Sequence, residues 1–352
     1  MECTERLPSG AGVVGGECAR PRSLEVTHDH GVDHGVEGLD AVDAAVQQLG
    51  RRQLAARHGV DRVAGGEGRG VHGPKLVADP ELASVQTGGV PAFADRTVVV
   101  TGAATGIGAA LAAALVDQGA RVHALDIAPV VAEVTMAVQC DLGTAASIDA
   151  AVEVLPGEIH AVFNCAGVPN GGRFSAAEVM AVNWLGLRHL TEVVLPRMPR
   201  DSAVVHVAST AGRGWPAHET ELRALLAAED FAAGAAWVEA HAEVVGDGYA
   251  FSKEAVQWYT MVGALDSLRE HGVRMNSICP GVTDTQLAQD FRRGVGDEVI
   301  DRAIEVAGRL AEPREMVGAM LFLADHAQAS YVNGINLNVD RGTGAAHLTG
   351  QW

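Results

Sequence analysis

From residue 93 to the end of the chain, short apolar runs alternate with longer stretches of helical periodicity. The helical stretch IGAALAAALVDQG, for example, ends at a glycine, and most of its apolar positions fall at helical spacing. The seven short runs that we expect to form strands are RTVVVTG, ARVHALD, MAVQCD, IHAVFNCAG, SAVVHVAST, VRMNSICPG and GINLNVD. Buried strands that alternate with helices indicate βα units, so the pattern predicts an α/β fold with a doubly wound parallel sheet and helices on both faces.

Residues 1–92 show little of this periodicity and are rich in Gly, Val, His, Arg and Asp. We interpret them as a low-complexity, poorly ordered extension, and residues 93–352 as a single catalytic domain. His28, His30 and His34 suggest a metal site, but no second ligand cluster at fixed spacing accompanies them, so low complexity is the preferred interpretation and no metal is predicted. A further hypothesis is that an upstream start codon in GC-rich DNA produced this extension and that the native protein lacks it.

Composition excludes several classes of partner. The formal net charge of −18 argues against nucleic acid and anionic membranes, because both require a basic surface. The five cysteines form no CxxC pair, which indicates a reducing compartment. No apolar run reaches the ~18 residues of a membrane span, and the MECTER start does not resemble a secretory signal. We therefore expect a cytoplasmic protein.

A glycine-rich segment follows the first predicted strand and opens the first predicted helix. This segment is TGAATGIG, from Thr101 to Gly108. Gly102 allows a tight turn, Gly106 lets the backbone approach a pyrophosphate, and Gly108 lets the helix pack on the sheet. The free N–H groups of the helix N-terminus favour an anion there. The segment therefore predicts a dinucleotide-binding loop.

Two aspartates end the next two predicted strands. Asp126 lies 18 residues after Gly108, where a carboxylate accepts hydrogen bonds from both hydroxyls of an adenosine ribose and repels a 2′-phosphate. The glycine loop contains no arginine to offset this charge, so NAD is predicted over NADP. The alternative is a surface aspartate with no ligand role. Asp141 could accept a hydrogen bond from the adenine amino group.

Six motifs occur in the order found in the short-chain dehydrogenase/reductase family, and the resemblance covers residues 94 to about 345. The motifs are TGAATGIG, NCAG at Asn164–Gly167, VNWLG with Asn183, VASTAG with Ser209, the YxxxK pair Tyr249 and Lys253, and PGVTDT at Pro280–Thr285. Cys165 departs from the family pattern, which has a second asparagine there. The resemblance implies a Rossmann-type fold. Together with the loops, it implies that the cofactor-binding residues are Gly102, Thr105, Gly106, Ile107, Gly108, Asp126, Asp141, Leu142, Asn164, Ala166, Gly167, Tyr249, Lys253, Pro280, Gly281, Val282, Thr283 and Thr285.

The same resemblance implies that the catalytic residues are Asn183, Ser209, Tyr249 and Lys253. Tyr249 is the expected general acid/base. Residues four apart share a helix face, so Lys253 would lie beside it, where an ammonium would lower the pKa of the phenol. Lys253 is one of only two lysines in the chain, which otherwise uses arginine. Ser209 would hydrogen-bond the substrate oxygen, and Asn183 would hold a water that relays protons to Lys253. His206 is interpreted as a packing residue.

Ser209 and Tyr249 are 40 residues apart, a longer gap than most family members have. The extra segment has helical spacing and predicts a helical insertion before Tyr249. Its aromatic residues, including Trp215, Phe231 and Trp237, either line an apolar pocket or serve the core or a subunit contact. The insertion and a brief connection after Asp126 resemble the subgroup of 3α-hydroxysteroid dehydrogenase/carbonyl reductases and coniferyl-alcohol dehydrogenases.

The resemblance therefore implies an NAD-dependent oxidoreductase that interconverts an alcohol and its ketone or aldehyde. The expected substrate is a bulky alicyclic, steroid or aryl-allylic alcohol, and the expected assembly is a homodimer or homotetramer. After PGVTDT, a helical lid is expected, with Arg292 and Arg293 either meeting a polar group of the substrate or forming an exposed face. The alternative function is a dinucleotide-binding regulator or scaffold without turnover, which would require neither Tyr249 nor Ser209.

Overall fold

The computed structural model describes residues 91–170, 173–295 and 297–351. The expectations for residues 1–90, including the histidine cluster at His28, His30 and His34, lie outside the described residues. Phe93 is already buried, two residues after the description begins.

A seven-stranded sheet forms the centre of the fold, with strand order β3-β2-β1-β4-β5-β6-β7, and every neighbouring pair is parallel. The strands are β1 (Thr97–Thr101), β2 (Arg121–Asp126), β3 (Met136–Gln139), β4 (Ala161–Asn164), β5 (Ala203–Val207), β6 (Arg274–Pro280) and β7 (Asn336–Val339). The predicted seven-stranded, doubly wound parallel sheet is thus confirmed. The strand order reverses between β1 and β4, and ligands of such sheets bind outside the carboxyl ends of the strands at this point.

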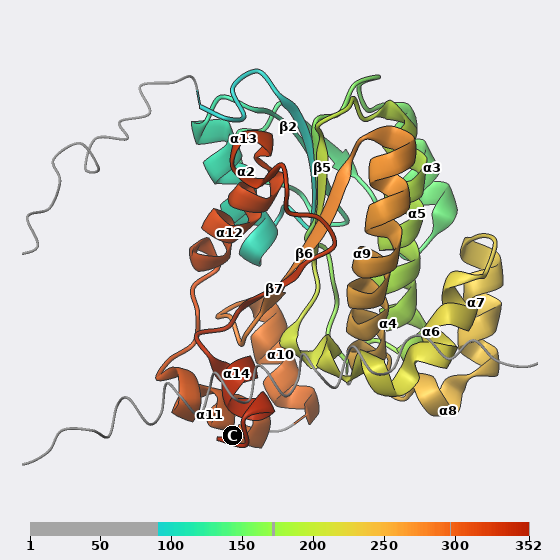
Figure 1. Ribbon diagram of the computed structural model, residues 1–352, viewed down its shortest axis with the longest axis vertical. Helices are drawn as coiled ribbons and strands as arrows, with labels where there is room; N and C mark the ends of the chain where they lie inside the picture. Colours follow the sequence, from blue (N-terminus) through green and yellow to red (C-terminus); the bar gives the residue numbers. More distant parts are fainter. Residues whose placement is uncertain (1–90, 171–172, 296, 352) are drawn as a thin grey trace, which may run out of the picture. The chain divides into compact units, whose positions relative to one another are not determined.

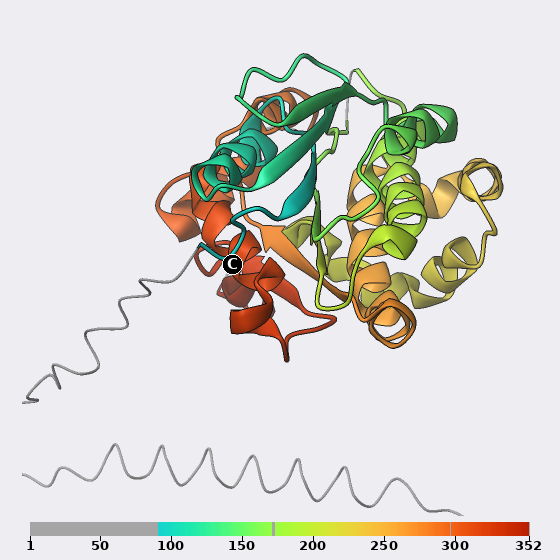
Figure 2. The same ribbon diagram turned by 90° about the horizontal axis from the view of Figure 1, so that it is seen from above.

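Helices cover both faces of the sheet, as Figures 1 and 2 show. On one face lie α2 (Gly106–Asp117) and α12 (Arg314–Ala324), and on the other α3 (Ala145–Glu153), α5 (Leu187–Val194) and α9 (Tyr249–His271). The remaining elements are α4 (Ala176–Met180), the π-helical η1 (Ala181–Gly186), the 3₁₀ segments η2 (Leu195–Arg197) and η3 (Thr210–His218), α6 (Glu219–Leu226), α7 (Phe231–Ala240), α8 (Ala242–Val245), α10 (Gln286–Val295), α11 (Asp297–Ala307), α13 (His326–Ala329) and α14 (Thr343–Leu348).

The local sequence explains these layers. β1 is TVVVT and is buried at every position, as expected of a central strand covered on both faces. Leu111 and Leu115 are four residues apart on α2 and fully buried against this sheet. Burial of each of these leucine side chains stabilises the fold by roughly 1.5–3 kcal/mol. The connection between β2 and β3 contains no helix, in agreement with its short length.

The insertion before Tyr249 comprises η3, α6, α7 and α8, and it packs on the outer side of α4 and α9 (Figure 1). Trp215 lies against Trp258 of α9 with ring centroids 5.3 Å apart, and Trp237 stacks on Phe251 at 6.0 Å. None of the three aromatic residues named for the insertion lines the main pocket. The interpretation as core packing is therefore supported, and the interpretation as pocket lining is wrong.

A contact between a histidine and a buried glutamate also joins the insertion to α9. His218 Nδ1 lies 2.6 Å from Glu254 Oε2, and the Glu254 side chain is only 6% exposed. Burial raises the pKa of Glu254, whereas His218 lowers it in part. The histidine partner compensates a carboxylate that would otherwise be costly to bury.

Within the part of the chain that the structure describes, no helix has both the length and the apolar character required to cross a bilayer.

Candidate active site

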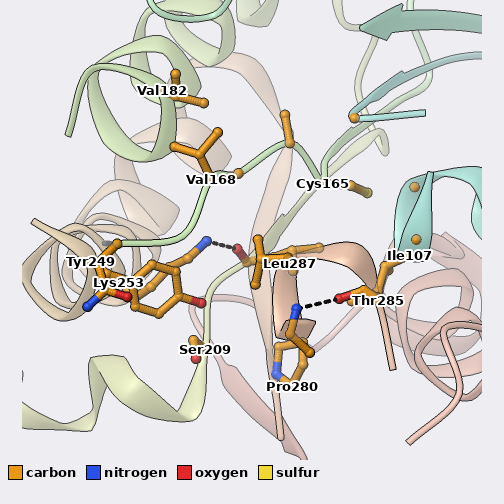
Figure 3. Close-up of a pocket in the computed structure, with 18 of the residues that line it drawn as sticks. Ile107, Cys165, Val168, Val182, Ser209, Tyr249, Lys253, Pro280, Thr285 and Leu287 are labelled. Carbon is orange, nitrogen blue, oxygen red and sulfur yellow. Dashed lines mark hydrogen bonds between the residues drawn. The ribbon is translucent and has the colours of Figure 1, made fainter. Parts of the chain in front are cut away.

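A pocket of about 930 Å³ opens at the carboxyl ends of the strands. Its walls come from the loops that follow β1 to β6, together with the beginnings of α9 and α10. Figure 3 shows Tyr249, Lys253 and Ser209 on one side of this space and Ile107 and Thr285 on the other. The glycine loop therefore lines one side of the pocket, and the tyrosine and serine line the opposite side.

The glycine loop has the geometry of an anion cradle. Gly102 has a φ of +65°, and a Cβ there would lie 2.7 Å from the Ala166 Cα. A Cβ on Gly108 would lie 2.2 Å from the Gly102 carbonyl oxygen, so only glycine allows this packing. Thr105 precedes α2 without capping it through its side chain, which leaves the first N–H groups of the helix available at the pocket. These residues fit a pyrophosphate.

Asp126 is held at the end of β2 by the backbone. Its Oδ2 accepts from the Ala104 N–H at 2.9 Å, and its Oδ1 accepts from the Ala128 N–H at 2.8 Å. The carboxylate lines the pocket and retains lone pairs for further donors. The basic side chains among the described lining residues are Arg173, Arg213 and Lys253, and none of them belongs to the glycine loop or to the end of β2.

Tyr249 and Lys253 begin α9 on one face of the helix, as their spacing predicted. Lys253 Nζ lies 5.8 Å from the centroid of the Tyr249 ring and donates to the Val207 carbonyl at 3.0 Å. Ser209 lies between β5 and η3, directly before the first residue of η3. Its side chain hydrogen-bonds Tyr249. The three side chains thus meet at the pocket wall, although Lys253 itself is only 5% exposed.

Burial is the largest influence on the pKa values of Tyr249 and Lys253. It raises the pKa of Tyr249 to about 12, while the hydrogen bond with Ser209 lowers it only in part. It also lowers the pKa of Lys253 to about 8, because the ammonium loses water. Burial thus has a larger effect on the phenol than the hydrogen bond with Ser209, and the expected lowering of the Tyr249 pKa by Lys253 stays a prediction.

Two expected site residues do not line the pocket. Asn183 is fully buried in η1; its Oδ1 accepts from the Val168 N–H at 2.8 Å, and its Nδ2 donates to the Val168 carbonyl at 3.0 Å. The side chain therefore fixes the loop after β4, and the expected role of Asn183 in holding a relay water stays a prediction. Asn164 is also buried, and its Nδ2 lies 3.0 Å from both Thr191 Oγ1 and His206 Nδ1. The side chain of Asn164 therefore packs in the core, and the expected contribution of this residue to cofactor binding stays a prediction.

His206 behaves as a packing residue, as interpreted from its strand position. It is fully buried, and burial lowers its pKa to about 3, so the imidazole is neutral at physiological pH. Its ring lies 5.8 Å from that of Tyr259, on the core side of the sheet.

Comparisons with known proteins agree with this geometry. Residues 96–220 match the family described as short chain dehydrogenase, and residues 232–344 match a family described as enoyl-(acyl carrier protein) reductase. The chain is 32% identical to coniferyl-alcohol dehydrogenase from Pseudomonas sp. (strain HR199 / DSM 7063), over 72% of this chain and 98% of that protein. The chain belongs to the short-chain dehydrogenase/reductase family. It is therefore an oxidoreductase.

Two further relatives share the subgroup predicted from the sequence. The 3-alpha-hydroxysteroid dehydrogenase/carbonyl reductase of Comamonas testosteroni is 32% identical, over 70% of this chain and 96% of that protein. The crystal structure of the 3-alpha-hydroxysteroid dehydrogenase from Pseudomonas sp. B-0831, complexed with NADH, is 30% identical, with a TM-score of 0.60 over 73% of this chain and 99% of that chain.

Sequence reasoning missed three polar residues of this short-chain dehydrogenase site. Gln257, one turn after Lys253, donates from Nε2 to the Ser209 carbonyl at 2.7 Å and so holds the serine backbone in place. Asn170 and Asp247 line the pocket and contact each other. The helical spacing of Gln257 from Lys253 was the only available signal for it, whereas nothing local marks Asn170 and Asp247 as neighbours.

The segment expected to form a lid contributes to the pocket. Gln286, Leu287 and Ala288 of α10 and Ile300 and Ala303 of α11 line it. The side chains of Arg292 and Arg293 lie outside the described residues, so neither interpretation of them is tested.

Proposed function

We propose that the chain is an NAD-dependent alcohol dehydrogenase/ketoreductase for a bulky alicyclic, steroid or aryl-allylic alcohol. The observation that carries this proposal is the convergence of Tyr249, Lys253 and Ser209 in the pocket that the glycine loop and Asp126 also line. A dinucleotide-binding scaffold, the alternative function, needs the glycine loop and the aspartate but not the other three residues.

The roles of the side chains follow from their positions. Tyr249 accepts the proton of the substrate hydroxyl during oxidation and returns it during reduction. Ser209, hydrogen-bonded to Tyr249, donates to the substrate oxygen and stabilises the charge that develops there. Lys253, with its ammonium beside the tyrosine ring, offsets the negative charge of the phenolate. Bound NAD supplies the hydride acceptor and a positively charged ring.

The proposed substrate class rests on the pocket and on the relatives. Many of the residues that line the pocket are apolar, among them Val168, Phe174, Leu287 and Ile300. Two relatives are named for coniferyl alcohol and for 3α-hydroxysteroids, both of which are bulky ring compounds. We propose a cytoplasmic location, in keeping with the acidic charge and with three free cysteines among the described residues. The proposed homodimer or homotetramer rests on membership of the family alone.

Turnover is tested by NADH formation at 340 nm with a panel of steroid, phenylpropanoid and simple alicyclic alcohols. We expect oxidation of at least one ring alcohol and weak activity with short linear alcohols, because these leave the apolar pocket unfilled. Binding of NAD without turnover of any alcohol or ketone would favour the scaffold.

Cofactor preference is tested at Asp126. We expect Asp126→Asn to reduce the NAD-over-NADP preference in kcat/KM by about ten- to hundredfold, because it removes a carboxylate that repels the 2′-phosphate. Asp117→Asn, an exposed aspartate at the end of α2, is the matched control and should preserve the preference. A wild-type enzyme that uses both cofactors equally would contradict the assignment of NAD.

A further inference from the structure

A pair of polar residues forms part of the pocket wall beside the catalytic tyrosine. Asp247 lies two residues before Tyr249, and its Oδ1 accepts from the Tyr249 N–H at 3.0 Å. Asn170, in the loop after β4, donates from Nδ2 to Asp247 Oδ2. Both residues line the pocket. The carboxylate is therefore held from two sides, by the first residue of α9 and by the loop that follows β4.

The two members of the pair differ in exposure. Asn170 is only 7% exposed, and its Oδ1 is buried without a hydrogen-bond partner among the described residues. Asp247 is exposed, and each of its oxygens keeps a lone pair after the two hydrogen bonds are made. A buried amide that orients an exposed carboxylate at a pocket wall produces a fixed acceptor.

Helix capping alone accounts for only part of this arrangement. Asp247 lies one residue before Gly248, the N-cap of α9, and accepts from the N–H of the first helical residue, whereas Asp230 is itself the N-cap of α7 and accepts from the Ala233 N–H at 2.8 Å. Asp230, however, does not line the pocket, whereas Asp247 both lines it and has a buried amide as a partner. The additional contact and the exposure toward the pocket are the features that capping does not require.

We propose that Asp247 is a specificity-determining residue that accepts a hydrogen bond from a second hydroxyl of the substrate, with Asn170 as its positioning residue. This inference rests on the proposed function and narrows it to alcohols with a further hydroxyl group. The Asp247 carboxylate lies at the backbone of Tyr249, and the reacting oxygen lies at the tip of its side chain. The separation is of the order of one tyrosine side chain, which a ring with oxygen substituents at opposite ends can span.

The chemistry of the acceptor defines what is recognised. A carboxylate favours a hydroxyl donor, is neutral toward a methyl group and repels a substrate carboxylate or phosphate. The enzyme should therefore differ in kcat/KM between two ring alcohols of the same shape, one with a hydroxyl and the other with a methyl as the distal group.

The experiment compares trans-cyclohexane-1,4-diol with trans-4-methylcyclohexanol, with kcat/KM measured for each under saturating NAD. We expect the wild type to prefer the diol about tenfold, which corresponds to one hydrogen bond to a charged group. In Asp247→Ala this ratio should fall to about one or below, and Asn170→Ala should reduce it in part. Asp230→Ala, which removes the N-cap of α7, should leave the ratio as in the wild type. The ratio is independent of the active fraction, so partial misfolding of a variant does not obscure it.

Each outcome has a distinct meaning. Equal efficiency with both alcohols in the wild type, or an unchanged ratio in Asp247→Ala, overturns the inference and leaves the proposed dehydrogenase function intact. If the wild type oxidises neither alcohol, the proposed function for alicyclic alcohols fails, and the inference fails with it.

Discussion

Replacing Tyr249 with phenylalanine is expected to lower kcat by about 10²–10⁴-fold, because it removes the group that transfers the proton of the alcohol. The ring remains and fills the same space, so the fold and NAD binding should persist. Single-turnover and steady-state measurements of NADH at 340 nm, together with a titration of NAD binding, separate the two effects.

The matched control is Tyr259→Phe on the same helix. Tyr259 is also buried, but its ring packs against Trp184 at 5.5 Å and does not line the pocket. This variant should keep most of the wild-type kcat. If Tyr249→Phe retained turnover comparable to that of Tyr259→Phe, the proton-transfer role of Tyr249 would be wrong.

The second large effect is expected at Lys253, where function and stability should change in opposite directions. Lys253→Met should reduce kcat by about 10²-fold or more, because the cation beside the phenol is lost. At pH 7, however, the free energy of unfolding should rise. Burial lowers the pKa of Lys253 from 10.5 to about 8, and each pKa unit corresponds to about 1.4 kcal/mol of unfavourable charge burial. The loss of the hydrogen bond to Val207 offsets about 1 kcal/mol, so the expected gain is about 2 kcal/mol.

The stability that Lys253→Met gains over the wild type should decrease as the pH rises above 8. Between pH 8 and 10.5 the unfolded chain keeps its proton at Lys253 while the folded protein loses it, so the wild type becomes more stable as the pH rises. The advantage of Lys253→Met is therefore largest below pH 8 and shrinks above it. Urea unfolding of both proteins at pH 7 and pH 9.5 measures this change.

Lys253→Arg provides the comparison for charge. Its guanidinium remains protonated across this range, so the variant should not gain stability and should not recover activity. A Lys253→Met variant that is no more stable than the wild type at pH 7, or whose advantage does not change with pH, would contradict the assigned cost of the buried ammonium.

The sequence alone predicted the elements that carry the site. β1 and β2 were visible as β-branched and apolar runs that end at the glycine loop and at Asp126, and the structure ends them there. The four-residue spacing of Tyr249 and Lys253 correctly placed both on one helix face. Such features depend on backbone periodicity and on side chains close together in the chain, so local sequence contains them.

Tertiary contacts decided the features that local sequence does not contain. Asn164 and Asn183 occur in motifs associated with the site, but the packing of β4 and η1 turns their side chains into the core. The sequence left open whether the aromatic residues of the insertion line a pocket or serve the core, and the structure packs Trp215 and Trp237 against α9.

The chain pattern by itself therefore determined the parallel sheet, the phosphate loop and the identity of the tyrosine and its lysine, because each is encoded within a few neighbouring residues. Only the folded structure decided which polar groups face the pocket. Asn170 and Asp247 are 77 residues apart in the chain, and their contact exists because the loop after β4 and the start of α9 meet at the same edge of the sheet. Burial, which sets both pKa values and the exposure of each polar group, is a property of that assembly and has no local signal.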